Sequence, residues 1–171
     1  VDGFLDLKNA ICKKFKRDNN LDYQTDQIVV STGAKQSIAN VCMSLINKGD
    51  EVVIPTPYWV SYSAMVSLAD GIPVFVHPDE GANYKVTAEQ LESAITEKTK
   101  MIMLNSPNNP SGSVFSEEEY LEFSKVLLKY PNIIVVSDEI YEHINYGSKS
   151  VSFASLPGMY ERTVTVNGIS K

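Results

Sequence analysis

Hydrophobic and polar residues fall into blocks whose spacing switches between that of helices and that of strands. Helical spacing or a helix-capping signal marks 5–17, 34–47, 58–69, 87–95 and 116–129. Short apolar runs typical of strands occur at 27–31, 51–54, 72–76, 101–104, 133–136 and 163–167. Because apolar strands alternate with amphipathic helices, the pattern predicts an α/β fold of three layers, with a mostly parallel sheet and helices on both faces.

Local signals support this assignment of elements. Thr87 with Gln90, and Ser116 with Glu119, are capping boxes that open two of the predicted helices. Cys42 lies on the apolar side of the helix at 34–47, so we expect it to be a small core residue. No repeat, low-complexity stretch or linker divides the chain, which therefore reads as one domain.

Composition narrows the range of partners. The chain has 171 residues, of which 43% are hydrophobic and 21% charged, with a net charge of -6. Nucleic-acid binding needs clustered Lys and Arg, and the one basic cluster (Lys13, Lys14, Lys16 and Arg17) reads as a solvated helix face. No apolar run has the length of a membrane span. We expect neither nucleic acid nor membrane as a partner.

Cysteine and histidine usage points to a reduced, metal-free protein. Cys12 and Cys42 form no CxxC motif and are too few for a disulfide scaffold, which favours a reduced, cytoplasmic location. His77 and His143 have no metal-ligand spacing, and we expect both to be structural or surface residues. No signal peptide is visible, but Val1 is not a start residue, so we expect that an N-terminal segment is missing.

Polar and aromatic residues follow five of the predicted strands. They are 32–35, 57–59, 105–112, 137–141 and 167–171. In open α/β sheets, ligands bind beyond the carboxyl ends of the strands, where these residues should meet. A single such strand end would carry little information, but the five together predict a ligand site.

Two of these segments have features suited to a flat, anionic ligand. Gly33, Ala34 and Lys35 open a helix with small residues, so their free N–H groups can face a phosphate. A plain strand-to-helix turn is the alternative. Trp59, the one tryptophan, offers a flat face for an aromatic ring, or else it fills the core.

The remaining segments offer polar groups with distinct chemistry. Asn109 sits in a proline-containing loop and can donate to a ligand oxygen or hold the turn. Asp138 follows an apolar strand, where a carboxylate needs a cationic partner or serves as a helix N-cap. Tyr141 is one helical turn further and can face the same way, or it packs in the fold without a chemical role. Lys171 differs from the other lysines only in that it follows the end of a predicted strand.

Four motifs taken in order resemble a known family. They are PYWVSY at 57–62, SPNNPSG at 106–112, SDEIYEH at 137–143 and VNGISK at 166–171. The chain from residue 3 onward resembles the large domain of fold-type I enzymes that use pyridoxal 5′-phosphate (PLP), specifically class I aminotransferases of the bacterial aspartate aminotransferase kind. The resemblance implies that fold and a homodimer in which the partner completes each site.

The resemblance also implies catalytic roles. Lys171 would hold the cofactor as a Schiff base and then carry the proton between the substrate Cα and the cofactor. Asp138 would pair with the pyridine nitrogen and keep it protonated, which preserves the electron sink. Tyr141 would hydrogen-bond the phenolic oxygen of PLP.

Further residues are implied as cofactor contacts. Asn109 would share the phenolic oxygen with Tyr141, and Trp59 would stack on the ring. The helix start at Gly33, with the backbone of Ala34 and Lys35, would bind the phosphate.

Some features of the family pattern are missing from this sequence. Gly168 stands where some relatives carry a serine that contacts the phosphate. The family's phosphate-binding and carboxylate-binding arginines follow the lysine, and its partner-subunit tyrosine precedes a glycine like Gly3, all outside residues 1–171. The resemblance therefore implies a partial large domain, less than half of a family chain, lacking an N-terminal segment and the C-terminal small domain. We expect residues 1–171 alone to be inactive.

The activity that follows is transamination, with aspartate as donor and 2-oxoglutarate as acceptor. One alternative is a PLP-dependent lyase of the same fold, which would share the cofactor contacts. Another is a non-catalytic PLP-fold domain, which would have no use for the set of Asp138, Tyr141 and Lys171. A nucleotide-binding α/β domain would need a GxGxxG or Walker sequence, and neither occurs.

Overall fold

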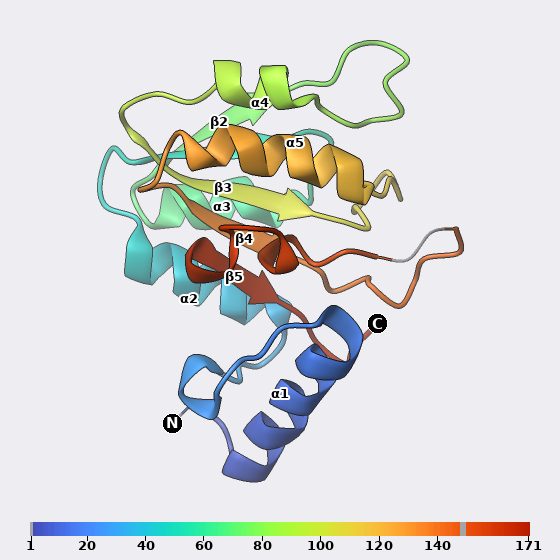
Figure 1. Ribbon diagram of the computed structural model, residues 1–171. Coiled ribbons are helices and arrows are strands. Elements are labelled where there is room, and N and C mark those ends of the chain that lie inside the picture. Colours follow the sequence, from blue (N-terminus) through green and yellow to red (C-terminus); the bar gives the residue numbers. More distant parts are fainter. Residues whose placement is uncertain (1, 148–149) are drawn as a thin grey trace.

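A computed structural model describes residues 2–147 and 150–171, and its centre is a sheet of parallel strands (Figure 1). The five strands lie in the order β2-β1-β3-β4-β5, and every neighbouring pair is parallel. Their bounds are β1 Glu51–Pro55, β2 Ile72–Val76, β3 Thr99–Asn105, β4 Ile134–Asp138 and β5 Thr163–Val166. The prediction of a three-layer α/β fold is confirmed.

Helices cover both faces of the sheet. The α-helices are α1 Leu5–Asn19, α2 Ala34–Leu45, α3 Ser61–Leu68, α4 Ala88–Ser93 and α5 Glu117–Leu128. Short 3-10 helices occur at η1 Thr25–Gln27, η2 Phe153–Ser155 and η3 Tyr160–Arg162. In Figure 1, α4 and α5 lie on one face, α2 and α3 on the other, and α1 lies beyond the β5 edge.

The alternation of side chains along the central strand explains the two cores. Met101 and Met103 of β3 pack with α2 and α3, whereas Ile102 and Leu104 pack on the α5 side. All four side chains are buried, because a strand covered on both faces has no solvent side. Cys42 is fully buried in the first of these cores, as predicted.

The helix starts follow the capping signals. The Thr87 and Ser116 hydroxyl oxygens each accept a hydrogen bond of 3.2 Å, from the backbone N–H of Gln90 and Glu119 respectively. Both capping boxes are complete. The helix predicted at 58–69 is shorter, since α3 begins only at Ser61.

The strand predicted at 27–31 is wrong. Gln27 ends η1, and residues 28–31 join no strand of the sheet. The backbone N–H of Val30 instead donates to the carbonyl of Asp2 at 2.9 Å, and Val29 is exposed. β-branched residues favour a strand only where a neighbouring strand supplies a hydrogen-bond ladder, and this segment has none although Ile28 is buried.

The basic cluster also differs from expectation at one position. Lys13, Lys16 and Arg17 are exposed, as predicted for a solvated face. Lys14 instead turns inward and forms an ion pair with the buried carboxylate of Glu142. A local pattern of charges cannot reveal a partner that lies so far along the chain.

Neither a membrane span nor a metal cluster is found among residues 2–147 and 150–171. No helix there is long and apolar enough to cross a membrane. No group of three or more His, Cys, Asp or Glu side chains there could hold a metal ion. The Nδ1 atom of His77 is hydrogen-bonded to the Thr56 hydroxyl at 2.9 Å, and the His143 side chain is largely exposed.

Candidate active site

A cleft of about 400 Å³ lies at the carboxyl ends of the strands and the start of α2. The residues that line it are Gly33, Ala34, Lys35, Trp59, Tyr62, Asn105, Asn109, Asp138, Ile140, Tyr141, Ser170 and Lys171. All eight sequence-predicted site residues are in this set, although they come from five separate segments. The cleft has the size of a pocket for a small organic ligand.

Asp138 provides a buried carboxylate at the end of β4. Its side chain accepts a hydrogen bond of 2.5 Å from the Tyr62 hydroxyl and one of 3.3 Å from the backbone N–H of Ile140. Burial raises the pKa of Asp138, and these two hydrogen bonds oppose the rise. A cation brought into the cleft would therefore gain a partly desolvated partner.

Tyr62 is held in its protonated, donating form. Burial raises the pKa of its hydroxyl, and the charge of Asp138 raises it further. Its ring packs edge-on against Trp59, with centroids 5.5 Å apart. Tyr62 thus links the aromatic wall of the cleft to the carboxylate.

Asn105 fixes the loop that follows β3. The strand register places it beside Asp138, and its amide donates to the Asp138 carbonyl at 2.9 Å. Its side-chain oxygen accepts from the backbone N–H of Asn109 at 2.8 Å. The Asn109 amide in turn lies 3.4 Å from the Tyr141 hydroxyl. Asn109 and Tyr141 can therefore both donate to one ligand oxygen.

The start of α2 contributes free backbone N–H groups to the cleft. Gly33 has φ 86°, a left-handed conformation that favours glycine, and a Cβ there would meet nothing within 4 Å. Its carbonyl accepts from the backbone N–H groups of Gln36 and Ser37. The N–H groups of Ala34 and Lys35 face no acceptor in the described part of the chain, as expected for the first turn of a helix.

Two cationic side chains reach the cleft, in the part of the chain that the structure describes. The Lys35 ammonium lies 4.9 Å from the centre of the Trp59 ring. Lys171 belongs to the exposed segment after β5 and contributes to the lining together with Ser170. The cleft thus combines a primary amine with a buried carboxylate.

Sequence reasoning missed Tyr62 and Asn105 as site residues. Tyr62 comes one helical turn after Trp59, a spacing that places both on one side of a helix. Asn105 ends β3 as Asp138 ends β4, but aligning the two predicted apolar runs by their last residues would have paired Asn105 with Ser137, one residue short of the observed register. Ile140 and Ser170 carried no distinguishing signal.

The fold and the site together define an α/β domain whose cleft brings together an amine, a buried carboxylate, an aromatic wall and the free N–H groups of a helix start. The chain belongs to the family of class I and II aminotransferases, which it matches over residues 1–171.

Individual proteins that the chain resembles carry names consistent with this family. The chain is 51% identical over 173 residues to a probable aspartate/prephenate aminotransferase of Rickettsia typhi, covering 100% of this chain and 43% of that protein. The aspartate aminotransferase structure from Rhizobium meliloti has a TM-score of 0.97 and 47% identity, over 100% of this chain and 43% of that one. The Thermus thermophilus aspartate aminotransferase with maleate has a TM-score of 0.95 and 36% identity, over 99% and 44%. The chain spans less than half of each.

Proposed function

We propose that this domain binds PLP and that the protein transfers an amino group from aspartate to a 2-oxo acid, 2-oxoglutarate. The observation that carries the proposal is the meeting of Lys171, a buried Asp138 and the α2 N-terminus in one cleft. We further expect a cytoplasmic homodimer.

The donor set fits the parts of this cofactor. Its phosphate matches the free N–H groups of Ala34 and Lys35, its ring the face of Trp59, and its phenolic oxygen the Asn109 and Tyr141 donors. When bound, PLP supplies an electron sink that stabilises the negative charge left at the substrate Cα once its proton is removed.

Three residues of the chain would have separate roles toward the cofactor and the substrate proton. Lys171 would hold the cofactor covalently through its amine and move the proton at the substrate Cα. Asp138 would keep the pyridine nitrogen protonated, and its burial strengthens that pairing. Tyr62 would keep the Asp138 carboxylate oriented and ionised.

The choice of an acidic substrate is supported by relatives and by charge. Relatives are named for aspartate, and the Thermus structure contains maleate, a dicarboxylate. Within the described residues, Lys35 is the cation that remains in the cleft once Lys171 is committed to the cofactor. A second carboxylate on the substrate would find a partner there.

The test uses the complete protein purified with its cofactor. Aspartate and 2-oxoglutarate should yield oxaloacetate and glutamate, and borohydride reduction followed by peptide mapping should find the cofactor on Lys171. Cofactor on another lysine would overturn the assignment of Lys171. Faster conversion of alanine or methionine than of aspartate would overturn the substrate choice, and elimination products in place of the oxo acid would favour the lyase.

A further inference from the structure

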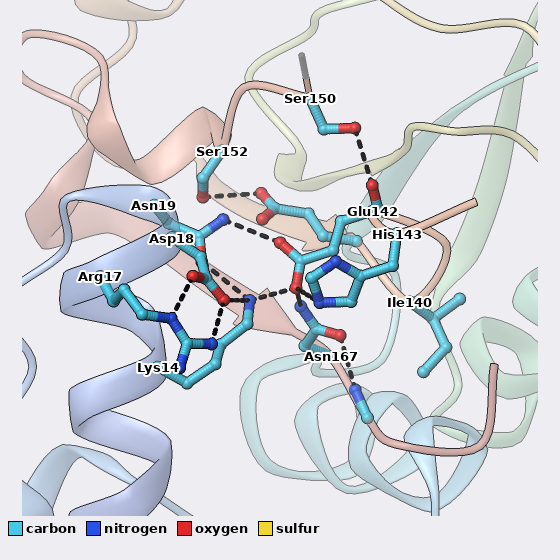
Figure 2. A network of polar contacts seen from close by, with 12 residues as sticks. Lys14, Arg17, Asp18, Asn19, Ile140, Glu142, His143, Ser150, Ser152 and Asn167 are labelled. Carbon is cyan, nitrogen blue, oxygen red and sulfur yellow. Dashed lines mark hydrogen bonds and ion pairs between the residues drawn. The ribbon is translucent and has the colours of Figure 1, made fainter. Parts of the chain in front are cut away.

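Glu142 is a buried carboxylate just outside the cleft, next in sequence to Tyr141. Its side chain is 5% exposed. It accepts hydrogen bonds from the ammonium of Lys14, from the Asn19 amide at 2.9 Å and from the Asn167 amide at 2.6 Å. Figure 2 shows these donors converging on Glu142 from α1 and from the segment after β5. None of the roles proposed above uses this carboxylate.

The carboxylate of Glu142 is held in its charged form. Burial opposes ionisation, but the hydrogen bonds from Asn19 and Lys14 and the charge of Lys14 prevail, so the pKa of Glu142 is lowered. His143 also lies near, with Nε2 3.4 Å from a carboxylate oxygen. An ionised acceptor makes hydrogen bonds that are shorter and stronger than those between neutral groups.

Asn167 connects this carboxylate to the segment that carries Lys171. Its side-chain oxygen accepts from the backbone N–H of Gly168 at 2.7 Å while its amide donates to Glu142. A Cβ at Gly168 would lie 2.9 Å from Ile140, so the backbone passes close to the wall of the cleft. In residues 2–147 and 150–171, no side chain beyond Asn167 is hydrogen-bonded to another element.

We propose that Glu142 is a positioning residue for Lys171, acting through the Asn167 side chain. By holding Asn167, it sets the direction in which the chain leaves β5 and hence where the Lys171 amine lies in the cleft. The inference rests on the proposed role of Lys171. A displacement of about 1 Å at a reacting group can cost about 100-fold in rate. The link between Glu142 and Asn167 should therefore affect the rate at which Lys171 reacts. The competing view is that Glu142 only fastens α1 to the domain.

Two asparagines of the chain separate these views. Asn19 and Asn167 each donate one amide hydrogen bond to the same carboxylate, from α1 and from the segment after β5. The complete apoprotein is mixed with PLP, and the rate of covalent attachment is followed by visible absorbance. Borohydride trapping identifies the lysine, and denaturant unfolding checks the fold. Asn167→Ala should slow attachment about tenfold, whereas Asn19→Ala should stay within about twofold of the parent.

Variants of Glu142 complete the test. Glu142→Ala should slow attachment as Asn167→Ala does, and the double variant should be no slower, because both changes break one link. Glu142→Gln keeps an acceptor oxygen for Asn167 and should restore most of the rate. If Glu142→Ala does not fold, the two asparagine variants decide by themselves, since both keep Lys14 and Glu142. Asn19→Ala also removes an acceptor of the Lys14 ammonium, 2.9 Å away, so it is the more demanding control for effects on α1.

The outcomes separate this inference from the proposed function. Equal attachment rates in Asn19→Ala and Asn167→Ala, whether slowed or not, would overturn the positioning role. A parent protein that attaches PLP to no lysine, or to a lysine other than Lys171, would overturn the proposed function and this inference with it. Slowing confined to the Asn167 and Glu142 alanine variants would support both.

Discussion

Asp138 is the residue whose charge the proposed chemistry depends on most, and the hydrogen bond from Tyr62 favours its ionised form. Burial raises the pKa of Asp138, and the Tyr62 hydroxyl, 2.5 Å away, is the first of the hydrogen bonds that lower it again. A carboxylate that is buried without such a donor moves toward its neutral form. The pairing is therefore a direct target for mutation.

Tyr62→Phe should slow transamination in the complete protein by about 10- to 100-fold while PLP still binds, because the loss of one charge-assisted hydrogen bond costs about 1.5–3 kcal/mol. The pKa of Asp138 should rise, so the acidic limb of the pH–rate profile should move to higher pH. Tyr58→Phe is the control, since the Tyr58 hydroxyl bonds Ser63 outside the cleft. An unchanged rate and pH profile in Tyr62→Phe would remove Tyr62 from this role.

Two buried glutamates near Asp138 titrate in opposite directions. The pKa of Glu142 is lowered, so its contribution to folding is present at neutral pH and is lost as pH falls through the folded-state pKa. Burial raises the pKa of Glu139 from 4.5 to about 7, despite hydrogen bonds from Ser137, Ser152 and Phe153. For Glu139 the folded state binds the proton more tightly, so stability falls as pH rises from 4.5 to about 7.

Glu139→Gln should remove that loss, which is on the order of 3 kcal/mol. The Gln side-chain oxygen can still accept the hydrogen bonds that Glu139 receives. Denaturant midpoints measured at pH about 5 and about 8 should fall less in Glu139→Gln than in the parent protein. The same decline in both proteins would show that Glu139 is not the titrating group.

At the scale of elements, the apolar runs predicted the sheet and the capping boxes predicted two helix starts. The run at 27–31 failed because strand propensity is local, whereas membership of a sheet depends on a partner strand. The α3 start at Ser61 was missed because residues 58–60 continue the apolar pattern without joining the helix. The order β2-β1-β3-β4-β5 was not predicted, since sequence spacing does not determine which parallel strands are neighbours.

The start of α2 is an element whose function can be tested separately from its stability. Gly33→Ala forces a residue with a Cβ to φ 86° and ψ 162°, a backbone region occupied almost only by glycine, at a cost of about 1–3 kcal/mol, and should displace the N–H groups of Ala34 and Lys35. PLP affinity in the complete protein, measured by equilibrium titration, should fall about tenfold.

Gly81→Ala is the matched control. Gly81 has φ 84° and, as at Gly33, a Cβ there would meet no atom within 4 Å, but Gly81 does not line the cleft. Both variants should lose similar stability, and only Gly33→Ala should lose affinity for PLP. Equal losses of affinity would mean that the start of α2 does not hold the phosphate.

At the scale of the whole molecule, the parallel sheet explains why so much of the site could be predicted. Strand ends on one edge gather segments that are distant in sequence, and Trp59, Asn109, Asp138, Tyr141 and Lys171 line one cleft for that reason. Gly33, Ala34 and Lys35 reach the same cleft from the start of α2, which follows a segment that is not a strand. The network around Glu142 could not be predicted in this way. It joins α1 to the segment after β5 through side chains, and no spacing rule links Lys14 or Asn19 to Asn167.

The distribution of cations across the molecule leads to a last prediction, about a polypeptide made of residues 1–171 alone. Its two arginines are engaged away from the cleft. Arg17 pairs with Asp18 on the surface of α1, and Arg162 donates to the carbonyls of Leu127, Tyr130 and Ile133. No guanidinium from the described residues therefore lies where it could form a bidentate hydrogen bond with the substrate carboxylate or the cofactor phosphate.

We expect this polypeptide, supplied with PLP, aspartate and 2-oxoglutarate, to form no measurable oxaloacetate, because orientation of the substrate Cα–H bond toward the lysine can supply about 7–11 kcal/mol of the barrier. The complete protein, assayed beside it, is the positive control. Circular dichroism would separate loss of fold from loss of orientation. Turnover by residues 1–171 at a rate close to that of the complete protein would show that Lys35 and the α2 N-terminus bind both anions unaided.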